Sequence, residues 1–195
     1  MAELILASAS SRRKELLAQI GVPFQSAAMD IDESVRLNEL PNDYVMRLAR
    51  EKARACLEHN PDSVVLAADT TVVVEGEILG KPENSEHAQR MLRQLSGKNH
   101  QVLTGIAVAK RIKDEITIAS RVVVTDVSFA AISNQQIAQY IKTGEPMDKA
   151  GAYAIQGKAA LFVERIEGSY SNVVGLPLAE TGKLLQDFGI PLWHE

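Results

Sequence analysis

The sequence predicts an α/β protein with a mixed parallel and antiparallel sheet flanked by helices. Short apolar runs typical of buried strands alternate with stretches of helical periodicity. The alternation does not keep a strict βαβ rhythm, so we expect both kinds of strand pair. The chain has 195 residues, of which 46% are hydrophobic and 24% charged, as in soluble globular proteins. We therefore expect a single domain over residues 1–195, either undivided or folded around a cleft between two lobes.

The first half of the chain predicts three strands and two helices. Strands are expected over residues 4–7 and 64–68, where the sequence is apolar, and over residues 24–29. A helix over residues 10–20 begins at two serines, which are good N-caps, and stops before a glycine. A stronger helix over residues 41–58 opens on a proline and is followed by Asn-Pro.

The second half predicts a hairpin, two long antiparallel strands and three helices. The hairpin joins residues 71–74 to 77–79 around Glu75-Gly76, and the long strands cover residues 101–110 and 116–129. The helices are expected from residue 84 or 85 to before 97, from Ser133 to about 142, and from Pro177 to near 189.

Composition and charge narrow the class of protein. The formal net charge is −4, whereas a nucleic-acid-binding protein is usually basic, so we expect no nucleic-acid partner. No apolar run has the length of a membrane span, and the start of the chain lacks the pattern of a signal peptide. The single cysteine, Cys56, cannot form an intramolecular disulfide. We expect a cytoplasmic protein.

Lys52 lies on the apolar face of the helix expected over residues 41–58. A period of 3.6 residues places it in the middle of a stripe of apolar side chains, while the other charged residues of the helix face the opposite way. A buried ammonium group is costly unless it meets an anion. Lys52 therefore either extends along the edge of the core to water, or points at a phosphate or at carboxylates.

The segment from Ser8 to Lys14 joins a predicted strand to a predicted helix. Free backbone N–H groups and the helix dipole make such a junction favourable for anions. Arg12, Arg13 and Lys14 add three positive charges where the dipole disfavours them. An anionic ligand would remove that conflict, and the alternative is a basic turn exposed to solvent.

Asp69 follows the apolar run of residues 64–68 and precedes Thr70. Polar residues at the carboxyl end of a strand often line the ligand site of an α/β sheet. A carboxylate at this position can hold a hard cation or activate water. The alternative is a turn aspartate that satisfies nearby backbone N–H groups.

Weaker candidates support the same chemistry. Asp30, Asp32 and Glu33 form an acidic stretch in an expected loop, and Lys81 follows the hairpin; such residues are usually solvated. The four histidines lack metal-ligand spacing, so zinc is not expected. Carboxylates suit magnesium or manganese.

Nine short segments, taken together and in this order, resemble the Maf family of nucleotide pyrophosphatases, and they run through nearly the whole chain. They are residues 6–13 (LASASSRR), 32–33 (DE), 47–53 (RLAREKA), 68–70 (ADT), 80–82 (GKP), 95–97 (LSG), 148–153 (DKAGAY), 155–157 (IQG) and 175–178 (GLPL). The family usually has proline where this chain has Ser11, which affects the shape of the first helical turn. The resemblance implies a fold like that of inosine triphosphatases, with two lobes around a central cleft, and a homodimer.

The resemblance also implies an activity and its residues. Segments 68–70 and 150–153, with Gln156, look like the branch that hydrolyses dTTP and UTP and unlike the branch that acts on 7-methyl-GTP. Arg12, Thr70 and Gln156 match the positions that set base preference, and Asp69 matches the proton acceptor. Substrates could include modified pyrimidine nucleotides.

The family reaction is attack of water on the α-phosphorus, with pyrophosphate as the leaving group. As a hypothesis, Asp69 activates the water, and Glu33 with Asp69 holds a divalent cation (Mg, Mn or Co). Lys52 and Lys81 would neutralise the phosphates. Ser8, Arg12 and Arg13 would line the phosphate or base end of the site, and spacing does not decide which arginine reaches the ligand.

Two other functions fit parts of the sequence. Asp30-Ile31-Asp32 has the Asp-x-Asp pattern of phosphatases with an aspartyl nucleophile, although the run before it is weakly apolar; formation of a phosphoenzyme would identify that class. A non-catalytic, nucleotide-binding regulator of cell division is the second alternative, which binding without turnover would support. The set of carboxylates and lysines is more than binding alone needs, and this favours an enzyme.

Overall fold

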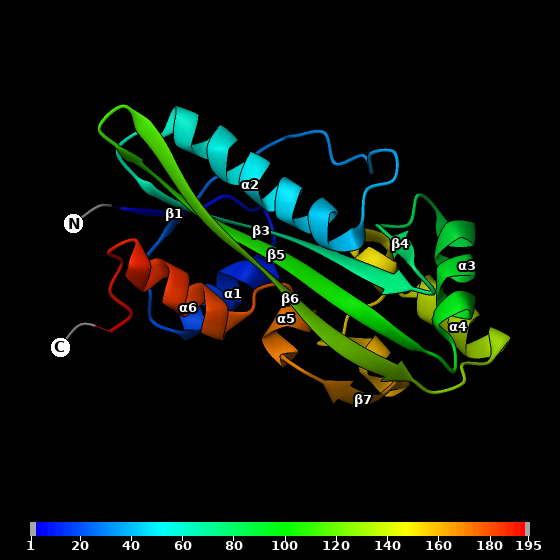
Figure 1. The fold of residues 1–195 in the computed structure, drawn as a ribbon. Helices are drawn as coiled ribbons and strands as arrows, with labels where there is room; N and C mark the ends of the chain where they lie inside the picture. The colour runs from blue at the N-terminus through cyan, green and yellow to red at the C-terminus, as the bar shows by residue number, and fades with distance from the viewer. Residues whose placement is uncertain (1–2, 194–195) are drawn as a thin grey trace. The chain divides into compact units, whose positions relative to one another are not determined.

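The computed structural model describes residues 3–193 and contains the mixed sheet that the sequence predicts, with helices beside it (Figure 1). The strand order is β2-β1-β3-β5-β6-β7, and β4 pairs with β3. The chain divides into two compact units. Among the described residues, the first unit comprises 3–69, 104–123 and 175–193, and the second comprises 70–103 and 124–174.

The first unit is built on parallel strands. β1 (Leu4–Leu6) pairs with β2 (Gln25–Ser26) and with the start of β3 (Val64–Val74), so that Leu6 lies opposite Leu66. β1 and residues 64–68 of β3 are buried on both faces, which explains their continuous apolar sequence.

Helices of the first unit lie on both faces of these strands. α2 (Pro41–His59) packs its Ala49, Ala53 and Cys56 against Val65 and Ala67 of β3. α1 (Ser11–Gln19) and α6 (Leu178–Asp187) lie on the other side of the strands in Figure 1. Ser10 caps α1 by accepting a hydrogen bond from the Arg13 amide, as an N-cap serine does.

The second unit packs helices and irregular segments around a separate core. Its regular elements are β4 (Glu77–Leu79), α3 (Ser85–Leu95), α4 (Asn134–Lys142), β7 (Val163–Glu167), α5 (Tyr170–Val174) and three 3-10 helices, η1 (Glu145–Asp148), η2 (Ala150–Ala152) and η3 (Lys158–Phe162). Asn84 caps α3, and Ser133 with Gln136 forms a capping box on α4. His100, Phe129 and Tyr153 stack edge to face within this core.

Three strands contribute residues to both units: β3 and the two long strands that follow α3. β5 (Asn99–Ile112) and β6 (Glu115–Phe129) are hydrogen-bonded neighbours joined by a two-residue turn, so they run antiparallel as predicted. None of the helices within residues 3–193 combines the length and the apolar character that crossing a membrane requires.

Several predicted boundaries were wrong. β2 has only two residues, both exposed, where a strand over residues 24–29 was expected. Residues 64–68 and 71–74 form one continuous strand, β3, so Asp69 lies inside a strand and does not follow its end. The sequence analysis did not predict β7, α5 or the 3-10 helices.

Candidate active site

The core of the candidate site is a buried lysine held between two carboxylates. The Lys52 ammonium Nζ donates to Asp69 Oδ1 at 2.6 Å and lies 2.6 Å from Glu33 Oε1. The side chains of Lys52 and Asp69 are 10% and 12% exposed, whereas that of Glu33 is 47% exposed. Lys52 therefore meets anions within the protein, as one reading of its position predicted.

The fold explains why these groups meet. Side chains alternate along a strand, so Asp69 points to the same face of β3 as Val65 and Ala67. That face is the one that α2 covers, and Lys52 lies on the α2 surface that packs against it. The ion pair lets β3 continue through a buried aspartate, because a paired charge costs far less to bury than an isolated one.

Arg13 approaches the same carboxylates from α1. Its Nε donates to the Gly175 carbonyl at 2.8 Å, and its Nη1 donates to the Ser8 hydroxyl at 3.3 Å. Removal from water lowers the pKa of the Arg13 guanidinium, whereas the charges of Asp69 and Glu33 raise it. Arginine nevertheless remains protonated in proteins. The three predicted site residues near the start of the chain, Ser8, Arg12 and Arg13, thus lie in one region. Arg12 is half-buried and precedes Arg13 on α1.

Tyr44 of α2 also contributes to this region, and the sequence analysis missed it. Its hydroxyl donates to the Glu33 carbonyl at 2.9 Å. Burial raises the pKa of Tyr44 to about 12, and the charges of Asp69 and Glu33 act in the same direction. The phenol therefore stays protonated and remains a donor at neutral pH.

Three predicted site residues belong to the second unit. Thr70 is half-buried in β3, directly after Asp69. Lys81 is exposed two residues after β4. Gln156 is exposed in a turn that the Gly157 amide closes by donating to the Ala154 carbonyl at 3.0 Å. Six of the nine predicted site residues thus lie within the first unit, and Thr70, Lys81 and Gln156 lie in the second. The six are Ser8, Arg12, Arg13, Glu33, Lys52 and Asp69.

The acidic stretch of residues 30–33 separates into different roles. Glu33 is the member that contacts Lys52, whereas Asp32 is exposed and accepts a hydrogen bond from the Ser34 amide. Within residues 3–193, no group of three or more His, Cys, Asp or Glu side chains lies together, so protein side chains alone do not complete a metal site. Glu33 and Asp69 each place one carboxylate oxygen 2.6 Å from the Lys52 Nζ.

Comparison with solved structures defines the class of fold. The chain matches the Staphylococcus aureus Ham1 protein with a TM-score of 0.50 and 15% sequence identity, covering 95% of this chain and 97% of that one. It matches a HAM1 protein from Coxiella burnetii with a TM-score of 0.50 and 18% identity, covering 96% and 100%. At these identities the comparison shows the fold, and it confirms the predicted α/β class.

Sequence comparison defines the family. The model of the family described as "Maf-like protein" matches residues 3–188. Proteins named dTTP/UTP pyrophosphatase are 53% identical in Anaeromyxobacter dehalogenans (98% of this chain, 97% of that protein), 54% in Methylobacillus flagellatus (98% and 96%) and 51% in Escherichia coli O157:H7 (96% and 94%). The chain therefore belongs to the Maf family, as the nine segments predicted.

Proposed function

We propose that this protein hydrolyses dTTP and UTP to the nucleoside monophosphate and pyrophosphate. The relatives that carry the name of this activity are 51–54% identical over almost the whole chain. The observation that supports the proposal most strongly is the arrangement of Lys52, which lies 2.6 Å from each of the carboxylates of Asp69 and Glu33. Arg13 interacts electrostatically with both carboxylates, so cations and carboxylates are present together, and such charges can position a phosphoanhydride and stabilise its phosphates.

In the proposed reaction, each of these residues has a separate role. Asp69 accepts a proton from the water that attacks the α-phosphorus, and pyrophosphate leaves. Lys52 and Arg13 stabilise negative charge that develops on phosphate oxygens, and Lys81 adds a further positive charge. The Ser8 hydroxyl, which accepts hydrogen bonds from Arg13 and from the Ser10 amide, is fixed in direction for contact with a phosphate.

Glu33 and Asp69 would hold a divalent cation, which we propose to be Mg, Mn or Co. The donor set fits such an ion, because both carboxylates already converge on the single cationic Nζ of Lys52. Magnesium is commonly bound by one or two carboxylates together with substrate phosphates. When bound, the ion supplies charge neutralisation at the phosphate oxygens.

We assign selection of the base to Gln156, with Arg12 and Thr70. The Gln156 amide offers one acceptor and two donors, which can match the O4 and N3 face of uracil or thymine. Its exposed position in the turn before η3 leaves the amide accessible to a ligand. We further propose that the protein is a homodimer and that it acts in the cytoplasm, on canonical or modified pyrimidine nucleotides.

A panel of canonical and modified triphosphates, incubated with the protein and Mg²⁺ or Mn²⁺, tests the proposal by the pyrophosphate released. We expect release from dTTP and UTP with the monophosphate as co-product. Asp69→Asn should lower kcat by about 10²-fold or more, because it removes the proton acceptor. Asp62→Asn, an exposed aspartate in the turn before β3, is the matched control and should leave kcat unchanged.

Two results would reject these assignments. Near-normal turnover by Asp69→Asn would remove Asp69 from the role of base. Nucleotide binding by the unsubstituted protein without release of pyrophosphate would favour the regulator of cell division over an enzyme.

A further inference from the structure

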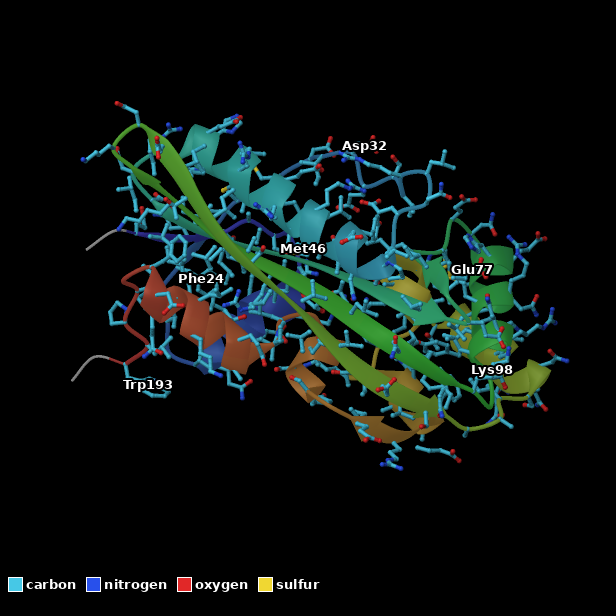
Figure 2. All side chains as sticks on the ribbon, viewed as in Figure 1. Phe24, Asp32, Met46, Glu77, Lys98 and Trp193 are labelled. Carbon is cyan, nitrogen blue, oxygen red and sulfur yellow. The ribbon has the colours of Figure 1, made fainter. Side chains whose placement is uncertain are left out.

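The loop that carries Glu33 is not held in place by apolar packing. None of residues 30–40 is buried. The apolar side chains in its second half are among the most exposed of the described residues, with Leu37 93%, Leu40 64% and Val35 49% accessible. A segment with so few buried apolar contacts needs polar contacts to keep one conformation. The loop runs beside α2, with Asp32 labelled in Figure 2.

Arg47 of α2 supplies the largest set of these polar contacts. Its Nε and Nη2 donate to the two carboxylate oxygens of Glu39 at 2.5 and 2.7 Å, a bidentate pair whose side chains are 13% and 8% exposed. Its Nη2 also donates to the carbonyl of Ser34 at 3.0 Å. Ser34 directly follows Glu33, so Arg47 fixes the backbone next to the carboxylate that contacts Lys52.

Further contacts extend the same arrangement. Glu39 accepts a hydrogen bond from the Arg36 amide at 3.0 Å. Through Glu39, the backbone at Arg36 is therefore connected to Arg47. Glu51 accepts from Arg47 at 3.3 Å and from Arg36 at 3.0 Å. The Tyr44 hydroxyl donates to the carbonyl of Glu33 itself. Tyr44 and Arg47, which lie one turn apart on α2, therefore donate hydrogen bonds to the consecutive carbonyls of Glu33 and Ser34.

We propose that Arg47 is a positioning residue that holds the loop of residues 30–40 so that the Glu33 carboxylate faces Lys52 and Asp69. Arginine is required because one planar fork must serve both oxygens of Glu39 and the Ser34 carbonyl at once. A lysine keeps the charge but lacks this geometry. The inference rests on the proposed role of Glu33 in the reaction. It goes beyond that role by assigning a function to a residue outside the set that contacts substrate.

The test is a double-mutant cycle of Arg47→Lys and Glu33→Ala. For each protein we would measure kcat/KM for dTTP, and by calorimetry the Kd of the non-hydrolysable α,β-imido analogue of dTTP with Mn²⁺. The Kd is measurable even for a variant that does not turn over. Arg50→Lys is the matched control, because Arg50 lies on the same helix, is exposed, and forms no hydrogen bond or ion pair within the described chain.

We expect Arg47→Lys to lower kcat/KM and to weaken analogue binding by about tenfold, as loss of a residue that orients a ligand-binding carboxylate does. Arg50→Lys should change neither. In the Glu33→Ala background, Arg47→Lys should change either quantity by less than about twofold, because its effect passes through Glu33.

Other patterns would overturn the inference. If Arg47→Lys has the same effect in both backgrounds, Arg47 supports the structure without acting through Glu33. If Arg47→Lys has no effect, the loop does not need it. If Glu33→Ala itself matches the unsubstituted protein in turnover and binding, the proposed role of Glu33 fails, and the inference fails with it; this pattern is distinct from the other two.

Discussion

Replacing Lys52 by methionine should destabilise the protein more than replacing its partner Asp69 by asparagine. In Lys52→Met, the Asp69 carboxylate stays buried without its ammonium partner, 2.6 Å away in the unsubstituted protein. In Asp69→Asn, Lys52 keeps the Glu33 carboxylate at 2.6 Å. The two substitutions break the same ion pair, but only the first leaves a buried carboxylate without the ammonium group that contacts it.

The magnitude follows from burial. Breaking a buried pair by removing one partner costs about 3–5 kcal/mol, and the side chains of Lys52 and Asp69 are only 10% and 12% exposed. Glu33 is 47% exposed, so water solvates its carboxylate when the lysine is lost. The ion pair of Glu33 with Lys52 therefore contributes about 0–1 kcal/mol to the free energy of unfolding. We therefore expect Lys52→Met to lower the free energy of unfolding by about 3 kcal/mol, and Asp69→Asn by about 1 kcal/mol.

Urea unfolding at pH 7, followed by far-UV circular dichroism, measures these values. The double variant Lys52→Met/Asp69→Asn is the decisive comparison, because it removes the charge left behind. We expect it to be more stable than Lys52→Met by about 2 kcal/mol. If Lys52→Met costs less than about 1 kcal/mol, or if adding Asp69→Asn destabilises it further, the buried charge is not what makes Lys52 necessary for folding.

Three further predictions concern other parts of the chain. Burial lowers the pKa of His100 from 6.5 to about 4, so the unfolded chain takes up the proton first as the pH falls. About 3 kcal/mol of stability, present above pH 6.5, should therefore be lost by pH 4. His100→Gln should flatten this dependence on pH in urea titrations. Gly105→Ala would place a Cβ 2.3 Å from the carbonyl oxygen of Val45 in α2, and thermal unfolding should show a loss of about 3 kcal/mol. Gln156→Ala should change the ratio of kcat/KM for UTP to that for CTP by about tenfold, because it removes the amide that matches the base.

Each of these three predictions has a result that would contradict it, and the Gly105 prediction also has a control variant. A His100→Gln variant that keeps the full dependence on pH between 6.5 and 4 would place its origin in other groups. Gly80→Ala is the control for Gly105, since its Cβ would meet nothing within 4 Å; equal losses of stability in the two variants would show that the contact with α2 is not the cause. An unchanged ratio in Gln156→Ala would remove that residue from base selection.

Local sequence predicted the α-helices of nine residues or more, because the ends of several carry recognisable caps. Asn84 and Ser133 cap α3 and α4 as expected from their residue types. β7 was missed because its residues 163–167 are all exposed or half-buried, so no apolar alternation marks it as a strand. The continuity of β3 was also missed, because a buried aspartate in a strand makes sense only once its partner on another element is known.

The candidate site was predictable only where a residue departs from a local sequence pattern. Lys52 was found because a charged residue in an apolar stripe breaks a pattern. Arg47 was not, since a charged residue on the polar face of a helix is ordinary, although it stands in the segment RLAREKA and four residues before Glu51. Its role depends on the conformation of the loop of residues 30–40, which no local pattern determines.

The proposed reaction is tested most directly by hydrolysis of dTTP in water enriched in ¹⁸O, with mass spectrometry of both products. Attack on the α-phosphorus with Asp69 as base predicts one ¹⁸O atom in dTMP and none in pyrophosphate, and at least about 10²-fold less product from Asp69→Asn in the same time. Label in pyrophosphate, or release of inorganic phosphate with dTDP, would contradict the proposed reaction and the roles given to Asp69 and Lys52.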